Sequence, residues 1–260
     1  MNKNDISVII PVHSLENDID KLMLKEAIQS VEKQMEQPEE LIIIIPKSEI
    51  DNLKLDDTTL TIRIIVNTGE TDFQSQLNFG VSKTTTEWFT FLEYDDELST
   101  NWIKNAKLYI TKKPDVGMFL PIIVDVNEEK QFIGFTNEIT WANQFSNEMG
   151  ILDLDVLKDY QNFNIDGMVL KKSTYESLGG LKSSIKLTFI YEFFLRIAYN
   201  GVRIMTIPKL GYKHVNRRVG SLSYNYKDIT PEENRFWIDL ASKEYYHKID
   251  RKITYEKSEV

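Results

Sequence analysis

The segment Trp88-Phe-Thr-Phe-Leu-Glu-Tyr-Asp-Asp-Glu-Leu98 changes abruptly from apolar to acidic side chains. Its first five residues are apolar and β-prone, which is typical of a short buried strand. Four carboxylates follow within the next five residues: Glu93, Asp95, Asp96 and Glu97. Ligands of open α/β sheets bind beyond the carboxyl ends of the strands. The segment therefore predicts a ligand site at that edge of a sheet.

The four acids have a functional and a structural interpretation. Glu93 and Asp95 alternate along an extended chain, so both side chains can point to the same side. Two convergent carboxylates suit Mg²⁺ or Mn²⁺, which would in turn hold a diphosphate. The structural alternative is a helix that begins near Ser99, because acids in a first turn stabilise the helix dipole. That alternative explains Asp96 and Glu97, and it leaves Glu93 and Asp95 as the better ligand candidates.

Composition excludes several classes of protein. A chain of 260 residues with 42% hydrophobic residues is long and apolar enough for one large α/β domain or two small ones. No apolar run approaches the roughly 20 residues of a membrane span, and without a signal peptide the expected location is cytoplasmic. The absence of cysteine excludes disulfides and argues against a zinc site. A net charge of −9 argues against broad nucleic-acid binding.

The order of the expected elements predicts a mostly parallel sheet. Strands are expected at residues 6–13, 41–45, 61–66, 88–92, 116–124, 166–170 and 202–207, and helices at 18–35, 71–83, 98–111, 173–178, 187–200 and 231–246. Strands and helices alternate in the first half, and the strands are continuously apolar, as in a sheet covered on both faces. Residues 209–223 are expected to form a basic loop, and 126–160 has no clear pattern. No glycine-rich phosphate loop is present, so a bound nucleotide would depend on a metal.

The order of these motifs resembles that of family 2 glycosyltransferases, which use nucleotide sugars and have the GT-A fold. The resemblance is carried by four segments: Ser7–Val12, Asn78-Phe-Gly80 with the acidic segment after it, Gly179-Gly180 followed by Glu192 to Arg196 and Gly201, and His214–Ser221. It implies a GT-A-type, Rossmann-like three-layer α/β sandwich with a mostly parallel central sheet. Residues 1–223 would form this domain, and residues 224–260 a C-terminal helix and tail that pack on it or on a protein partner.

The resemblance also implies a reaction and residue roles. A sugar would pass from a nucleoside-diphosphate sugar to a saccharide or other hydroxyl acceptor, in an inverting, non-processive and metal-dependent reaction. Asp95 corresponds to the metal-binding Asp of the family motif, Glu93 stands at its first acid, and His214 would be a further ligand of Mn²⁺ or Mg²⁺. The donor contacts implied are Pro11, His13, Asn78, Glu93, Asp95, Arg217 and Arg218. The two guanidinium groups match phosphate oxygens in geometry.

The chain departs from the family pattern at three functional positions. Pro46-Lys47-Ser48 stands where an acid usually reads the base, and Leu77 replaces the Arg of the Arg-Asn-x-Gly motif. The usual Glu-Asp pair with the catalytic base falls on Phe189 and Ile190, neither of which accepts a proton.

Two acids remain as candidates for the catalytic base, Glu192 and Asp166. The structural alternative for Glu192 is a routine surface ion pair with Arg196 one helical turn later. Asp166 has its own structural alternative, that of a turn residue at the end of a strand.

Two hypotheses of different classes therefore stay open. The first is an active glycosyltransferase, which Glu93, Asp95 and His214 favour. The second is a catalytically degenerate GT-A domain that serves as a binding or structural subunit, which Leu77 and Ile190 favour. A third hypothesis, a Rossmann-type nucleotide binder, is disfavoured because the glycine fingerprint is missing.

Overall fold

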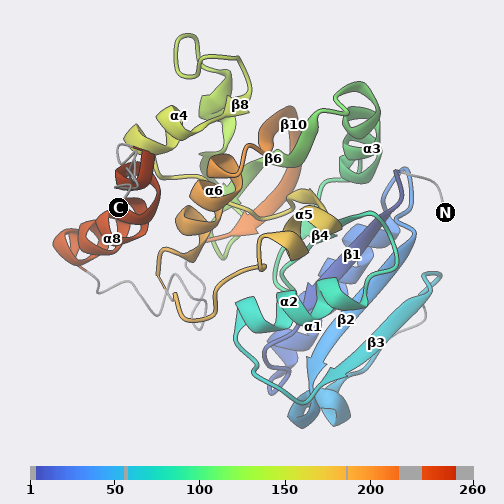
Figure 1. The fold of residues 1–260 in the computed structure, drawn as a ribbon. Coiled ribbons are helices and arrows are strands. Elements are labelled where there is room, and N and C mark those ends of the chain that lie inside the picture. Colours follow the sequence, from blue (N-terminus) through green and yellow to red (C-terminus); the bar gives the residue numbers. More distant parts are fainter. Residues whose placement is uncertain (1–3, 56–57, 186, 217–229, 250–260) are drawn as a thin grey trace, which may run out of the picture.

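The computed structural model describes residues 4–55, 58–185, 187–216 and 230–249 (Figure 1). Within them ten strands form one sheet: β1 (Ile6–Pro11), β2 (Glu40–Pro46), β3 (Ile62–Asn67), β4 (Trp88–Phe91), β5 (Glu97–Leu98), β6 (Val116–Val126), β7 (Phe132–Thr136), β8 (Ile151–Leu152), β9 (Val169–Lys171) and β10 (Arg203–Val215). The strand order is β3-β2-β1-β4-β9-β6-β10-β5, with β7 paired to β6 and β8 paired to β10.

The strand directions place several chain segments at one edge of the sheet. The strands β3, β2, β1 and β4 are parallel, and so are β6 and β10. Strand β9 lies between the two groups and is antiparallel to both β4 and β6. The carboxyl ends of β1, β4, β6 and β10 therefore share an edge with the amino end of β9.

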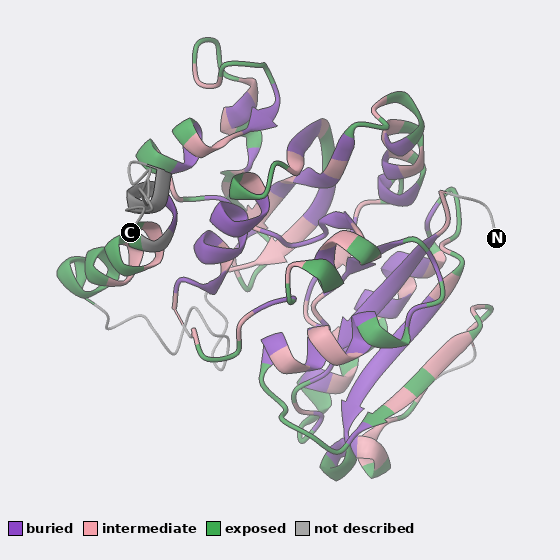
Figure 2. Ribbon diagram, viewed as in Figure 1, coloured by how far each residue is buried: buried purple, intermediate pink, exposed green. Residues whose placement is uncertain are grey.

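Helices cover both faces of the sheet, which confirms the predicted three-layer α/β fold (Figure 1). The buried side chains of α1 (Asp18–Glu32) and α3 (Trp102–Lys112) pack on one face. The other face is covered by α2 (Phe73–Lys83), α4 (Leu154–Asp159), α5 (Lys172–Ser177) and α6 (Phe189–Tyr199). Two short 3₁₀ helices, η1 (Lys47–Asn52) and η2 (Glu138–Trp141), join strands. Figure 2 shows the central strands buried between these layers.

Close packing explains the glycine of the Asn-Phe-Gly segment. A Cβ atom on Gly80 would lie 2.7 Å from Ile9 Cγ2 and 3.1 Å from Ile44 Cγ1. Helix α2 can therefore approach β1 and β2 closely only because this position has no side chain. This motif residue thus has a packing role that needs no ligand.

Helix α8 (Pro231–Ile249) packs on the domain through α6. Ile238, Ala241 and Tyr245 belong to the core on that face, whereas Phe236 and Leu240 are exposed. The division of the chain into residues 1–223 and a C-terminal segment 224–260 stays a prediction, because residues 217–229 and 250–260 lie outside the described residues. The role of α8 in binding a protein partner stays a prediction. None of the helices in the described ranges combines the length and the apolar character that crossing a bilayer requires.

One predicted boundary near the site is wrong. Strand β10 continues to Val215, although a basic loop was expected from residue 209. Its end pairs with both β6 and β5, and that pairing joins residues too distant in sequence for local patterning to reveal. Residues 126–160, for which the sequence shows no clear pattern, contain β7, η2, β8 and α4.

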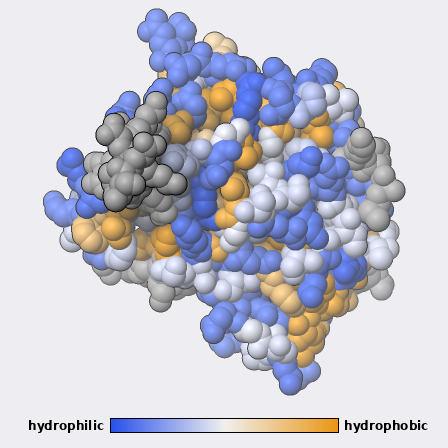
Figure 3. All heavy atoms as spheres, in the orientation of Figure 1, coloured by the Kyte–Doolittle hydropathy of each residue, from blue (hydrophilic) through white to orange (hydrophobic). Residues whose placement is uncertain are grey.

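The outermost strand of the sheet, β3, is only half covered. Its side chains Ile64 and Val66 are exposed. Figure 3 shows hydrophobic side chains gathered at the lower right, over the end of the sheet where β3 lies.

Candidate active site

The acidic segment lies beyond the carboxyl end of β4, as expected, and its centre is Asp96. Lys213 of β10 is the register partner of Glu97 in β5, so the pairing of these strands brings Asp96 beside His214. The Val215 N–H donates to Asp96 Oδ1 over 2.8 Å, and His214 Nδ1 lies 3.2 Å from Asp96 Oδ2.

The helix-cap interpretation of Asp96 and Glu97 is therefore wrong. Helix α3 begins only at Trp102 and has no acid in its first turn. Asp96 is buried against β10, and Glu97 belongs to β5, where Lys213 Nζ lies 2.5 Å from its carboxylate.

Asp166 joins this pair from the turn before β9. Its Oδ2 lies 3.4 Å from His214 Nδ1. One possible ligand atom each from Asp96, Asp166 and His214 all lie within 4.8 Å of one another. Three chain segments that are far apart in sequence thus converge on one point.

The cluster has more carboxylates than it has cations to balance them. Burial raises the pKa of Asp166 to about 7, with repulsion from Asp96 and Asp125 adding to the effect and the His214 charge opposing it. Burial, together with the nearby Asp166 and Asp95 charges, raises the pKa of Glu93 well above its usual range. Burial lowers the pKa of His214, but Asp96 and Asp166 outweigh it and raise that pKa well above its ordinary value. The excess of carboxylates around His214 therefore strongly favours a positive charge at this position, either on His214 or on a bound cation.

Two further residues of the site were not predicted from the sequence. Asp125 of β6 is the register partner of His214, and its carboxylate accepts a hydrogen bond from Thr136 Oγ1 over 2.7 Å. A single acid in an otherwise apolar strand was a signal that could have identified it. The buried Tyr212 Oη accepts a hydrogen bond from the Glu93 N–H over 3.0 Å. No sequence signal distinguished this tyrosine.

Pro11 and His13 lie at the end of β1, on the same edge. Pro11 is the last residue of β1 and is buried. The exposed His13 has its ring 6.2 Å from the ring of Tyr94 in the acidic segment, and its Nδ1 lies 3.2 Å from Gln76 Nε2. Both residues lie at the edge of the sheet that carries the site. Their predicted contacts with the nucleotide sugar stay predictions. Arg217 and Arg218 lie outside the described residues.

Asn78 is engaged by protein groups. Its Oδ1 accepts hydrogen bonds from the Leu181 N–H (2.9 Å) and the Tyr175 hydroxyl (2.5 Å), while its Nδ2 donates to Leu181 O (2.8 Å). These bonds join α2 to the Gly179-Gly180 turn, where Gly180 has φ +64°. The geometry gives Asn78 a structural role, and its predicted contact with the nucleotide sugar stays a prediction.

Glu192, the other candidate base, is the centre of a separate ion-pair cluster. Its carboxylate lies 2.8 Å from Arg196 Nη2 and 2.7 Å from Lys182 Nζ, and it accepts a hydrogen bond from the Tyr245 hydroxyl over 2.6 Å. Burial raises the pKa of Glu192, but hydrogen bonds from Arg196, Lys182 and Tyr245 outweigh burial and lower it. Glu192 is thus a buried, charged residue that ties α8 to α6, and the pair with Arg196 is not the surface pair that was expected.

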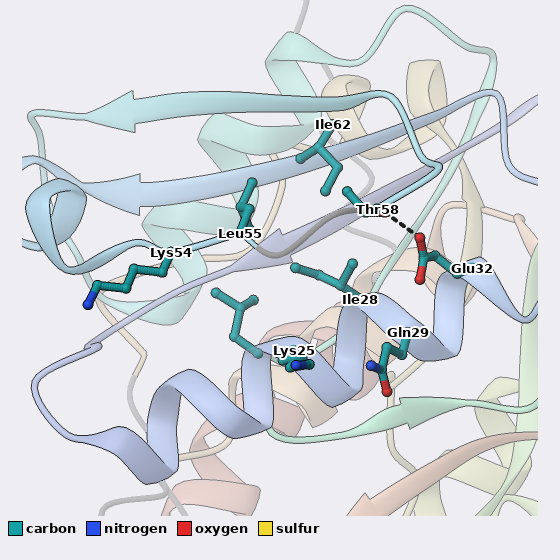
Figure 4. A pocket seen from close by; sticks show the side chains of 9 residues that line it. Lys25, Ile28, Gln29, Glu32, Lys54, Leu55, Thr58 and Ile62 are labelled. Carbon is teal, nitrogen blue, oxygen red and sulfur yellow. Dashed lines mark hydrogen bonds between the residues drawn. The ribbon is translucent and has the colours of Figure 1, made fainter.

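A small cavity between α1 and the segment after η1 is not a competing site. It has a volume of about 40 Å³ and is lined by both apolar side chains, such as Ile28 and Ile62, and polar ones, such as Gln29 (Figure 4). The Thr58 hydroxyl donates to Glu32 at one end of it. Small-molecule sites typically have about 300–1,000 Å³, so this space is too small for a nucleotide.

Comparison with known proteins identifies the family. The model of glycosyl transferase family 2 matches residues 7–167. The structure of residues 1–349 of S. aureus TarS with UDP has 12% identity and a TM-score of 0.60, and the match covers 93% of this chain and 66% of that one. The complex of the same TarS fragment with UDP-GlcNAc has 13% identity and a TM-score of 0.64, with 93% and 67% covered.

The match covers only 39% of a longer TarS structure, with 16% identity and a TM-score of 0.58. At such identities the likeness concerns the fold alone, and this chain spans about two thirds of the TarS fragment in its complex with UDP. A comparison with curated protein sequences gave no match. The family match and the shared architecture lead to one conclusion: this chain belongs to glycosyl transferase family 2 and has the GT-A fold.

Proposed function

We propose that this chain transfers a sugar from a nucleoside-diphosphate sugar to an acceptor hydroxyl, with inversion and without processivity. One observation supports an active site most strongly. Asp96, Asp166 and His214 converge within 4.8 Å at the sheet edge where ligands of open α/β folds bind. Inversion and non-processivity rest on the family resemblance.

The residues present fit a divalent cation. Among the described residues, five carboxylates lie close enough to influence one another's charge, and His214 lies among them: Glu93, Asp95, Asp96, Asp125 and Asp166. Carboxylate oxygens are the ligands that Mg²⁺ and Mn²⁺ prefer, and imidazole is a common metal ligand. Asp96, His214 and the neighbouring Asp95 or Glu93 would hold the ion, which supplies Lewis-acid stabilisation of the diphosphate leaving group.

Asp166 is the residue that we assign as the proton acceptor. In the reaction, the acceptor hydroxyl oxygen bonds to the anomeric carbon, the bond from that carbon to the diphosphate breaks, and the hydroxyl proton passes to the Asp166 carboxylate. A pKa of about 7 suits this role, because a general base works best when its pKa is near the working pH. We prefer Asp166 to Glu192 for this role, because the Glu192 carboxylate already has Arg196, Lys182 and Tyr245 as partners.

The alternative, a degenerate domain that only binds, is favoured by one observation. Phe189 and Ile190 occupy the first turn of α6, where the family has its Glu-Asp pair, and both belong to the apolar core on that face. The proposal does not depend on that pair, because Asp166 in the carboxylate cluster would supply the proton acceptor from another segment.

Release of nucleoside diphosphate tests the proposal. The TarS structures contain UDP or UDP-GlcNAc, so UDP-GlcNAc is the first donor to incubate with the protein and Mn²⁺, with water as the acceptor. GDP-, CDP- and TDP-sugars follow, because the usual base-reading acid is absent here. We expect slow Mn²⁺-dependent release of the diphosphate from one donor class. If the folded protein releases the nucleoside diphosphate from none of these four donor classes, the hypothesis of a catalytically degenerate domain replaces the proposal.

A further inference from the structure

The Asp166 carboxylate is held by a residue that the proposed reaction does not itself require. Residues 160–165 form neither helix nor strand, so no regular element fixes the approach to this acid. We propose that Asn164, itself anchored by Asn137, is a positioning residue that orients Asp166 for proton transfer. The inference rests on the proposed function and deepens it.

Asn164 contacts Asp166 in two ways. Its Nδ2 donates to Asp166 Oδ2 over 2.6 Å, which is a short, charge-assisted bond. Its Oδ1 accepts from the Ile165 N–H over 2.7 Å and from the Asp166 N–H over 3.4 Å, so the side chain also shapes the turn. One amide thus fixes both the backbone and the carboxylate of the proposed base.

Asn137 anchors this turn to the sheet. Its side chain accepts a hydrogen bond from the Asn164 N–H (3.0 Å) and donates to Asn164 O (2.9 Å) and Pro121 O of β6 (3.1 Å). Asn137 is 1% exposed and has φ +73°, a conformation that Asn tolerates better than most residues. The amide pairs with the Asn164 backbone as a neighbouring strand would.

The other side of the turn is fixed as well. The Trp102 indole N–H donates to Gly167 O over 2.9 Å. A Cβ atom on Gly167, which has φ +67°, would lie 2.7 Å from Tyr212 Cδ2. Asp166 therefore cannot move along the chain direction without disturbing buried aromatic residues.

The two contacts on the carboxylate leave one oxygen for the reaction. Within the described residues, the hydrogen bond from Asn164 and the contact with His214 both involve Oδ2. We assign Oδ1 as the oxygen that receives the proton. Without Asn164 the carboxylate can rotate, so the loss should appear in the rate and not in donor binding.

Two substitutions of Asn164 separate positioning from turn formation. Asn164→Asp keeps an oxygen for the Ile165 and Asp166 N–H groups but has no N–H for the Asp166 carboxylate. Asn164→Ala loses both functions. We expect both variants to lower kcat for UDP release about 10- to 100-fold, the usual range for residues that orient a functional group, with the donor KM within about 2-fold of wild type. The matched control is Asn200→Ala, which removes a bond to Arg196 O at the end of α6.

Each outcome of this experiment decides the inference. If Asn164→Asp turns over like wild type while Asn164→Ala does not, Asn164 only forms the turn and the inference is overturned. Equal losses in the Asn200→Ala control would attribute the effect to general destabilisation and overturn it as well. If the wild-type protein releases diphosphate from no donor, the proposed function and this inference are both overturned. An active wild type with either of the two results above overturns the inference alone.

Discussion

Asp166→Asn is expected to lower kcat for diphosphate release by about 10²–10⁴-fold, the usual contribution of a general base. Asparagine keeps the size of the side chain but cannot accept the proton. Because the proposed cation and donor contacts lie on Asp96, His214 and the acidic segment, the Kd for UDP in the presence of Mn²⁺ should change by less than about 3-fold. Steady-state kinetics and calorimetric titration of the same preparation provide both values.

The matched control for this variant is Asp115→Asn, which removes an exposed ion pair with Arg203. It should leave kcat unchanged. If Asp166→Asn weakens Mn²⁺-dependent UDP binding as strongly as it lowers kcat, Asp166 is a metal ligand and not the base. An unchanged kcat would remove Asp166 from the mechanism.

Glu192→Ala is expected to lower the free energy of unfolding by about 3–5 kcal/mol, because it leaves the buried Arg196 guanidinium without its carboxylate. The substitution also removes the acceptor for Lys182 and for the Tyr245 hydroxyl of α8. Urea unfolding of wild type and variant measures the difference, provided that both unfold in a single transition. The exposed Glu176→Ala, which loses only an i,i+4 pair with Lys172, should cost less than about 1 kcal/mol.

The sign of the pH dependence follows from the direction of the Glu192 pKa shift. Its hydrogen bonds lower the pKa of Glu192 in the folded protein, so its stabilising effect is complete above the unfolded value of about 4.3. The effect is lost as the pH falls through the lowered folded pKa. The difference in the free energy of unfolding between wild type and Glu192→Ala should therefore be constant at neutral pH and become smaller below about pH 4. If this difference in the free energy of unfolding stays constant below about pH 4, the conclusion that Glu192 is charged in the folded protein is contradicted.

Several strands and helices could be predicted from the sequence because their signals are local. Continuous apolar runs at 41–45 and 88–92 predicted buried strands, and the apolar face of residues 187–200 predicted α6. The family resemblance supplied the three-layer architecture, and the structure confirms it.

The centre of the site could not be predicted in the same way. Asp96 has the same local pattern as a helix-capping acid, and only the pairing of β5 with β10 places it beside His214. Asn137 and Asn164 are unremarkable polar residues in a region without periodicity, and their role appears only when β6 and the turn before β9 are seen together. These contacts join residues that are far apart in the chain, so local patterns did not identify the roles of Asp96, Asn137 and Asn164.

The most direct test of the central claim is calorimetric titration of UDP into wild type and Asp96→Asn, each with and without Mn²⁺. The claim that the Asp96–His214 cluster is a metal-dependent donor site predicts micromolar binding by wild type that requires Mn²⁺. It also predicts at least about a 10-fold loss of affinity in Asp96→Asn. Binding that is equally strong in both proteins, or independent of Mn²⁺, would contradict the claim.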